Sequence, residues 1–245
     1  MPPKPRTLQE LVDEQVARAE AARKQPLAGV ESPVPLVVTI SREMGSGALL
    51  IAQQVAEDLG WSLWGRELLD PMAEAGKVGR EVVEAFDEKH VGQMERLFHS
   101  VFGVSDVAEF SYARQLYRVV SGIARLGNAV ILGRGANYML PDALSVRIVA
   151  SMEHRVENMM RFEQLGHDEA VARLRRSDGD RRQYLITMFG KRKLESTVFD
   201  LQLNMDNLDL RTAAEMIKVA ILGRARVLAE RYPDGQRSPL VPPKP

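Results

Sequence analysis

The chain has 245 residues, with 33 Lys and Arg against 33 Asp and Glu, 45% hydrophobic residues and no cysteine. This length suits one α/β domain with extensions, and such a chain buries roughly 70–75% of its unfolded surface without a metal or disulfide. The lack of cysteine excludes disulfide scaffolds, cysteine-containing zinc sites, iron–sulfur clusters and thiol nucleophiles. The balanced charge disfavours bulk nucleic-acid binding. The sequence shows neither an apolar run of the ~20 residues that cross a bilayer nor a start resembling a signal peptide. We therefore expect a cytoplasmic protein with no membrane partner.

Residues 1–34 are expected to form an amphipathic helix followed by a linker. Apolar residues recur at helical spacing over residues 7–24, and Glu14 precedes Arg18 by four residues, a favourable pair on a helix surface. Three prolines and a glycine between residues 25 and 35 indicate the linker. The apolar stripe is narrow, so the helix must dock on something. It either packs against its own domain or contacts a partner, such as a second copy in a homo-oligomer.

Residues 35–232 are expected to form the main domain, and residues 233–245 a disordered, proline-rich tail. A short β-branched run at 37–40 predicts a buried strand, followed by a glycine-rich turn at 41–47 and a helix at 48–59. The other predicted strands are 62–64, 129–132, 146–149 and 201–203, and the other predicted helical segments are 67–110, 112–126 and 210–232, the last with Asp209 as N-cap. Strands that alternate with helices indicate a parallel sheet covered on both faces.

The first candidate site is the turn Ser41–Gly47. A glycine turn between a strand and a helix directs backbone N–H groups and the positive helix end at one point, which is a geometry that holds a phosphate. The full phosphate-loop pattern G-x-x-x-x-G-K-[ST] is not satisfied, because Arg42 stands at the first glycine, Ala48 at the lysine and Leu49 at the magnesium-binding hydroxyl. The turn therefore predicts anion binding, and the alternative is a tight turn that only joins strand to helix.

Two arginine-containing segments are further candidates. Arg134 lies between Gly133 and Gly135 at the end of a predicted strand, where ligands bind in open parallel sheets, and arginine suits bidentate phosphate recognition. Residues 173–193 hold eight basic and two acidic residues, a local excess of six positive charges. This segment is either a solvated helix face or a mobile arm that closes over phosphates and neutralises their charge.

Two other features predict no site. None of the four histidines is spaced from another by three or four residues, so we expect no histidine pair that binds a metal. The pair Met159-Met160 is interpreted as filler in the hydrophobic core.

Taken in order, these segments resemble the cytidylate kinase-like family, which is related to bacterial cytidylate kinases and other nucleoside monophosphate kinases. The resemblance covers about residues 35–220 and rests on V-V-T-I-S-R-E-M-G-S-G, W-G-R-E-L-L, V-I-L-G-R-G-A-N-Y-M-L-P-D-A, V-A-S-M-E-H-R-V, S-D-G-D-R-R-Q-Y and F-D-L-Q-L-N. It implies a three-layer α/β/α P-loop kinase-like fold with a five-stranded parallel sheet. It also implies a phosphotransferase that moves a phosphoryl group from ATP, accompanied by Mg²⁺, to a cytidine-type nucleotide or similar small phosphorylated acceptor.

The resemblance assigns roles residue by residue. The donor nucleotide would be held by Ser41, Arg42, Met44, Gly45, Ser46, Gly47 and Arg155. The acceptor would be held by Arg66, Gly133, Arg134 and Gly135. The lid would contribute Arg176, Arg181 and Arg182, which neutralise the transferring group, and Asp178, which orients the lid. Tyr184 completes the family's lid pattern D-x-x-R-x-x-Y, and no residue is assigned as a metal ligand.

The sequence departs from true cytidylate kinases at several residues of the predicted site. Cytidylate kinases carry Lys-Gly-Thr or a similar triplet where this chain has Ala48-Leu49-Leu50, and Gly135 replaces the aspartate of Gly-Arg-Asp. Gly65 also replaces an aspartate that usually precedes the arginine at position 66. A second hypothesis therefore stays open, in which the protein is a catalytically weak or inactive nucleotide-binding regulatory module.

Overall fold

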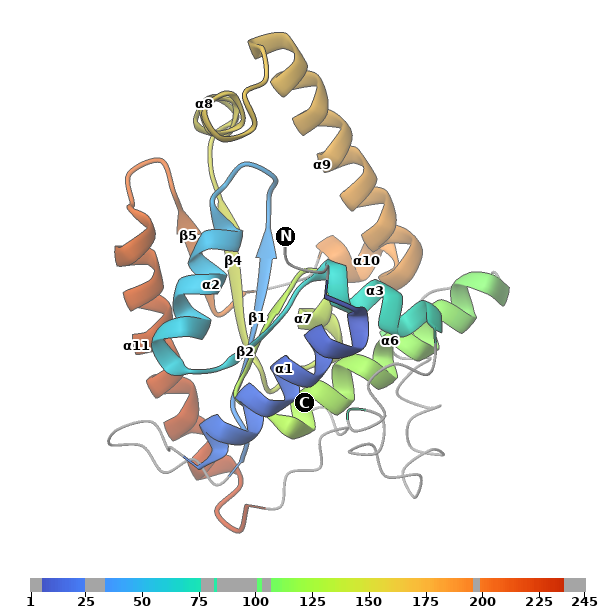
Figure 1. Ribbon diagram of the computed structural model, residues 1–245, viewed down its shortest axis with the longest axis vertical. Helices are drawn as coiled ribbons and strands as arrows, with labels where there is room; N and C mark the ends of the chain where they lie inside the picture. The colour runs from blue at the N-terminus through green and yellow to red at the C-terminus, as the bar shows by residue number, and fades with distance from the viewer. Residues whose placement is uncertain are drawn as a thin grey trace.

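The computed structural model describes residues 6–24, 34–75, 82, 101–102, 107–195 and 199–235. At its centre lies a five-stranded, fully parallel sheet of order β2-β3-β1-β4-β5, which confirms the predicted fold class (Figure 1). The strands are β1 (Val37–Arg42), β2 (Ser62–Trp64), β3 (Ala129–Leu132), β4 (Leu144–Val149) and β5 (Leu201–Asn204). All five predicted strands are present. β1 runs two residues further than predicted and β4 begins two residues earlier.

The central strand β1 sets the position of the candidate site. It pairs with β3 and β4, with Ile40 opposite both Leu132 and Val146. The N–H group of Gly133 also donates to the carbonyl of Ile40 at 2.9 Å. Because the carboxyl ends of β1 and β3 lie side by side, the turn after β1 and the glycine loop after β3 meet at one edge of the sheet.

Helices cover both faces of the sheet, and the pleat of β1 explains why. Val38 and Ile40 pack into the core shared with α2 (Ala48–Leu59) and α11 (Leu210–Arg231), whereas Val37 packs into the opposite core. That second core includes residues of α1 (Leu8–Arg23), α3 (Arg66–Ala75), α6 (Val107–Leu126) and the short α7 (Ala136–Met139). The result is the three-layer α/β/α arrangement seen in Figure 1.

Helix α1 packs against its own domain, which is the first of the two alternatives considered for it. Val12 and Val16 are buried in the core with α3 and α6. The Gln15 side-chain oxygen accepts a hydrogen bond from the backbone N–H of Leu63 at 2.8 Å. This contact occupies a backbone donor on the edge strand β2. Contact of α1 with a partner or a second copy stays a prediction.

An arm of two helices, α8 (Met152–Glu163) and α9 (His167–Phe189), rises over the carboxyl edge of the sheet (Figure 1). It holds a small core of its own, in which Val156 and Met159 of α8 pack against Ala170 and Leu174 of α9. The core interpretation of Met159 is thus confirmed, but that of Met160 is wrong, because Met160 is 41% exposed on the other side of α8. The basic segment begins within α9 and ends in α10 (Lys191–Glu195).

Several predicted segments lie partly or wholly outside the described residues. Within 67–110 the structure describes α3, which begins at Arg66, and the start of α6, which begins at Val107. Most of the linker at 25–35 and of the tail lie outside the described ranges. The N-cap of α11 is confirmed, because Asp209 accepts from the N–H of Thr212 at 2.8 Å. None of the described helices is long and apolar enough to span a membrane.

The packing of α11 on the sheet gives a stability prediction. Ile217 is fully buried in the core with α2, so Ile217→Ala leaves a cavity and should lower the free energy of unfolding by about 2–5 kcal/mol. Val219 lies on the same helix with 67% of its surface exposed, so Val219→Ala should change the free energy of unfolding by less than ~0.5 kcal/mol. Urea unfolding followed by circular dichroism measures both. Equal losses in the two variants would contradict this placement of α11.

Candidate functional site

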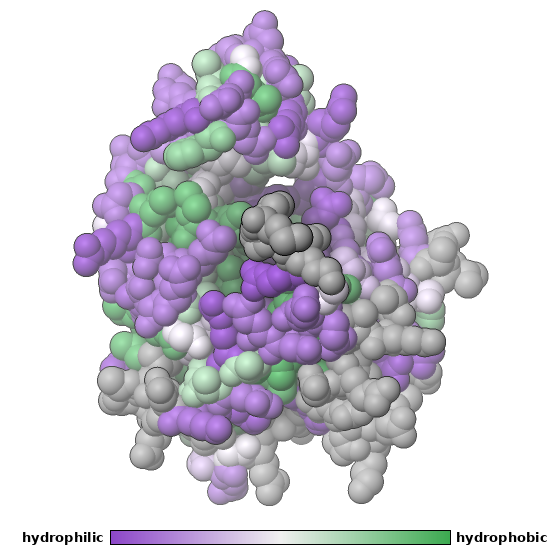
Figure 2. Space-filling model, in the orientation of Figure 1, coloured by the Kyte–Doolittle hydropathy of each residue, from purple (hydrophilic) through white to green (hydrophobic). Residues whose placement is uncertain are grey.

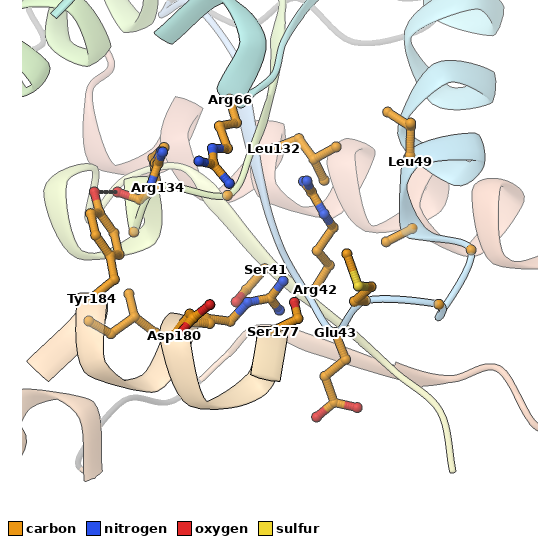
Figure 3. Close-up of a pocket in the computed structure, with 18 of the residues that line it drawn as sticks. Ser41, Arg42, Glu43, Leu49, Arg66, Leu132, Arg134, Ser177, Asp180 and Tyr184 are labelled. Carbon is orange, nitrogen blue, oxygen red and sulfur yellow. Dashed lines mark hydrogen bonds between the residues drawn. The ribbon is translucent and has the colours of Figure 1, made fainter. Parts of the chain in front are cut away.

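A cavity of about 680 Å³ lies at the carboxyl edge of the sheet, beneath the α8–α9 arm. Its wall comes from the β1–α2 turn, the start of α3, the β3–α7 loop and the inner side of α9. Figure 2 shows the surface hollowed beneath the arm, and Figure 3 shows side chains from these four segments around the cavity. The segments are far apart in the sequence, so only the fold assembles this site.

Side chains of α8 anchor the β1–α2 turn through hydrogen bonds to two of its carbonyl groups. Arg155 Nε donates to the carbonyl of Met44 at 2.6 Å, and Asn158 Nδ2 donates to the carbonyl of Gly45 at 2.8 Å. Gly45 has φ +80°, and a Cβ there would meet the backbone oxygen of Arg155 at 2.9 Å, so only glycine fits. Two carbonyls of the turn thus point toward α8. The first turn of α2, which starts after an uncapped Gly47, lines the cavity with N–H groups that have no partner within the helix.

The first turn of α2 brings no charged or hydroxyl side chain to the cavity. Ala48 is buried, and Leu49 and Leu50 are 46% and 45% exposed at the cavity wall. Leu49 cannot ligate Mg²⁺, which takes oxygen ligands. Within the described residues there is also no cluster of three His, Asp or Glu side chains that could hold a metal. At the first turn of α2, the groups that could hold an anion are therefore backbone N–H groups and the positive end of the helix dipole.

Asp70 organises the arginines on the opposite side of the cavity. Its carboxylate forms ion pairs with Arg134 and, at 3.3 Å, with Nε of Arg66, and it accepts from the Tyr112 hydroxyl at 2.8 Å. Arg66 is 71% exposed in its side chain, whereas Arg134 is largely buried. Asp70 was missed in the sequence. The signal that points to it is its position four residues after Arg66 on a helix, which places both side chains on one face.

Tyr184 of α9 covers Arg134 from the side of the arm. The guanidinium carbon of Arg134 lies 4.8 Å from the ring centre of Tyr184, a cation–π contact, and the Tyr184 hydroxyl donates to the carbonyl of Arg134 at 3.5 Å (Figure 3). Burial is the largest single influence on the pKa of Arg134 and lowers it, but the hydrogen bond with Asp70 and the electrostatic effects of Tyr112, Asp70 and Tyr184 together raise the pKa on balance. Burial also raises the pKa of Tyr184 to about 12 and that of Tyr112 further still. Both phenols therefore remain protonated near neutral pH.

Two further arginines reach the cavity from β1 and α9. Burial lowers the pKa of Arg42, and the positive charges of Arg66 and Arg134 add to the decrease, against the opposing charge of Glu67. Burial and then the charge of Arg42 lower the pKa of Arg181 to about 10. Each of these guanidinium groups is thus in an environment that disfavours its charge, and a bound phosphate would relieve the repulsion between them.

The structure brings most of the predicted site residues to one cavity. Those on its wall are Ser41, Arg42, Met44, Gly45, Gly47, Arg66, Gly133, Arg134, Gly135, Arg176 and Arg181. Four predicted residues are not on this wall, namely Ser46, Arg155, Asp178 and Arg182. Cavity residues to which the sequence argument assigned no individual role include Asn137, Arg173, Ser177 and Asp180.

The four residues that are not on the wall have other surroundings. The hydroxyl of Ser46 donates to the carbonyl of Glu43 at 2.7 Å, and so closes the turn from within. The carboxylate of Asp178 accepts from Arg155 Nη2 at 2.8 and 3.0 Å. Arg182 is exposed on α9. These contacts suit residues that shape the turn and the arm.

Comparison with known proteins agrees with this geometry. Residues 37–207 match the cytidylate kinase-like family, which is more than half of the chain. The chain belongs to this family. It is 22% identical over 188 residues to a cytidylate kinase of Pyrococcus horikoshii, a match that covers 76% of this chain and 88% of that protein. A crystal structure of an uncharacterized protein from Eubacterium ventriosum aligns with a TM-score of 0.55 and 22% identity, and covers 76% of this chain and 98% of that chain.

The surroundings of Gly135 leave no room for the aspartate that the resemblance places at this position in cytidylate kinases. Gly135 has φ +68°, and a Cβ at this position would lie 2.2 Å from Cε2 of Phe189. Phe189 is itself stacked against Tyr138, with ring centres 4.6 Å apart, and against Phe102 at 5.2 Å. A buried aromatic cluster thus occupies the space beside Arg134 that a side chain at position 135 would need.

Arg155 gives a prediction about the turn and the arm together. Arg155→Met removes a buried guanidinium and leaves the carbonyl of Met44 and the carboxylate of Asp178 without this partner. It should lower the free energy of unfolding by about 3–5 kcal/mol, and speed amide hydrogen exchange in the β1–α2 turn. Arg18→Met removes an exposed ion pair with Glu14 and should cost less than ~1 kcal/mol. Urea unfolding and mass-spectrometric hydrogen exchange test both, and an Arg155 variant as stable as the Arg18 variant would refute the role given to Arg155.

The contact of Gly135 with Phe189 gives a second prediction. Gly135→Asp should destabilise the protein by about 1–3 kcal/mol, because the new side chain overlaps the Phe189 ring. The loss should be smaller by at least ~0.5 kcal/mol when the same change is made in a Phe189→Ala background. Gly133→Asp is the control, since a Cβ there meets only Arg42 Nη1 at 3.6 Å and should show no coupling to position 189. Chemical denaturation of the five variants measures this coupling, and additive losses for Gly135→Asp would count against the overlap.

Proposed function

We propose that this protein is a nucleoside monophosphate kinase-like phosphotransferase, which moves the γ-phosphoryl group of ATP to a cytidine-type nucleotide or a similar small phosphorylated acceptor. One observation carries the proposal: the glycine-rich β1–α2 turn and the arginine pair organised by Asp70 open onto the same cavity. A donor phosphate chain and an acceptor phosphate therefore have binding groups on opposite sides of one space. Membership of the cytidylate kinase-like family supports the same reaction class.

The donor side would hold the phosphates of ATP through the backbone of Gly45–Gly47 and the N-terminus of α2. The turn is shaped before any ligand arrives, because α8 side chains fix two of its carbonyls. Preorganised N–H groups bind a phosphate without the energetic cost of first arranging them. The acceptor side would hold a phosphate on Arg134, whose guanidinium is fixed by Asp70 and Tyr184.

The reaction itself needs positioning and charge neutralisation more than covalent help. An ionised oxygen of the acceptor phosphate attacks the γ-phosphorus and forms the new P–O bond. The bond between the γ-phosphorus and the β–γ bridging oxygen breaks, and ADP departs with its electron pair. No proton has to be removed from the attacking oxygen, so the scheme requires no general base. Arg176 and Arg181 of α9 would neutralise charge on the transferring group.

In this proposal Mg²⁺ binds only as part of the Mg-ATP complex. Mg²⁺ in kinases is bound largely by substrate phosphates and water. The described residues provide no hydroxyl at position 49 and no carboxylate cluster for it. The side chains present therefore do not form a magnesium site of their own, and no step of the scheme is assigned to the ion.

A nucleotide-binding regulatory module is the second candidate function. The observation that favours it is Leu49, which is about half exposed at the cavity wall where a kinase carries a hydroxyl. In that case the cavity binds a nucleotide, the arm responds to it, and no phosphoryl transfer follows.

A coupled assay of ADP formation tests the proposal directly. Purified protein with Mg-ATP should phosphorylate at least one of CMP, dCMP, UMP and AMP. Arg134→Met should lower kcat/KM at least ~100-fold, as loss of one preorganised charged group does in other enzymes. Arg226→Met changes an exposed arginine on α11, far along the chain from the cavity segments, and should leave the rate unchanged.

Two outcomes separate the candidate functions. Absence of turnover with all four acceptors refutes the nucleotide kinase proposal. Calorimetric titration with ATP then tests the regulatory module, which requires binding without turnover. Loss of ATP binding as well would refute both.

A further inference from the structure

The side chain of Arg42 lies at the centre of the cavity, although its position in the motif is normally a glycine. Arg42 is the last residue of β1. Figure 3 shows its guanidinium directed toward Leu132 and Arg66, while the next side chain, Glu43, extends the opposite way. Nη1 of Arg42 lies 3.6 Å from the place that a Cβ on Gly133 would occupy. The side chain of Arg42 thus reaches from the β1–α2 turn to the glycine loop that follows β3.

Among the residues that the structure describes, Arg42 has no counterion. Two neighbouring arginines are paired, Arg134 with Asp70 and Arg155 with Asp178. Within the part of the chain that the structure describes, Arg42 forms no ion pair, and its buried Nη1 has no hydrogen-bond partner. A buried charged donor without an acceptor is destabilising, so its retention indicates an anion that binds there.

The neighbours of Arg42 indicate the charge of that anion. Arg66, Arg134 and Arg181 all interact with Arg42 electrostatically. Glu67 is the one acid among the charges that affect Arg42 most. Four guanidinium groups around one space suit a ligand with several negative charges, such as a phosphoanhydride or two phosphates held close together.

We infer that Arg42 takes the place of the missing phosphate-loop lysine. The lysine of that motif reaches the β- and γ-phosphates from the first turn of the helix. Here that position holds the small, buried Ala48, and a cation enters the same region from the end of β1 instead. Arg42 binds the phosphate chain between the donor turn and the acceptor arginines. The catalytic part of this role rests on the proposed function, whereas the phosphate-binding part does not.

Pyrophosphate binding tests the inference without any acceptor or turnover. Isothermal titration calorimetry should show ~10–100-fold weaker binding of pyrophosphate to Arg42→Met than to the wild type, the loss expected for charge-assisted hydrogen bonds. Restoring the lysine in an Arg42→Met, Ala48→Lys double variant should recover most of this loss. Arg226→Met is the matched control and should bind as the wild type does. Wild-type protein that fails to bind pyrophosphate, or Arg42→Met that binds it equally well, overturns the inference.

The double variant tests most directly whether Arg42 replaces the lysine. A folded double variant that binds as poorly as Arg42→Met shows that Arg42 does not act in the lysine's place. If Ala48→Lys unfolds the protein, Arg42→Lys replaces it. Arg42→Lys should bind pyrophosphate within ~10-fold of the wild type, because it keeps a cation at the same position, and a loss equal to that of Arg42→Met overturns the inference. A wild type without kinase activity, together with weak pyrophosphate binding by Arg42→Met, refutes the proposed reaction and supports the phosphate role of Arg42.

Discussion

The buried guanidinium of Arg155 is the interaction on which the candidate site depends. Only 4% of this residue is exposed. Its Nε holds the carbonyl of Met44, its Nη2 binds the carboxylate of Asp178, and its Nη1 lies 3.7 Å from Glu43. These groups come from the β1–α2 turn and from α9. One side chain therefore fixes the shape of the turn and the position of α9 relative to it. The carbonyls of Met44 and Gly45 are thus satisfied on the α8 side, and the N–H groups of the first turn of α2, which have no partner within the helix, lie at the cavity.

The net charge of zero gives no indication of the arginine-rich cavity. The sum of zero combines an arginine-rich cavity with acids that lie elsewhere or that pair with selected arginines. Asp70 makes Arg134 a rigid binding group, since an ion pair and a stacked Tyr184 both restrain it. Arg42 has no such partner in the described part of the chain, and its pKa is lowered by burial and by its cationic neighbours. The cavity wall therefore carries six arginines against the two acids Glu43 and Asp180, an excess of positive charge that suits an anionic ligand.

The sequence predicted the elements well because both signals it used are local. Short β-branched runs and apolar periodicity placed all five strands, and the glycine motifs placed the turn at residues 41–47 and the loop around Arg134 at one sheet edge. The roles of Asp70 and Arg155 could not be predicted in this way. Arg155 and Met44 are 111 residues apart, and Asp70 and Arg134 are 64 apart, so their contacts exist only once the sheet has formed. The clash between position 135 and Phe189 likewise depends on where α9 ends.

Two of the departures from cytidylate kinases lie on opposite sides of the same cavity, and each has a physical counterpart. On the acceptor side the aspartate is replaced by Gly135, and Phe189 fills the space that its side chain would need. On the donor side the lysine is replaced by Ala48, and Arg42 brings a cation from the neighbouring strand. Loss of function alone explains an apolar first turn in α2. It does not explain why Arg42 keeps a buried Nη1 that has no partner among the described residues, an arrangement that is destabilising unless a ligand binds there. The arrangement of charge thus favours a cavity that still binds phosphates, with the cation supplied from β1 and no longer from α2.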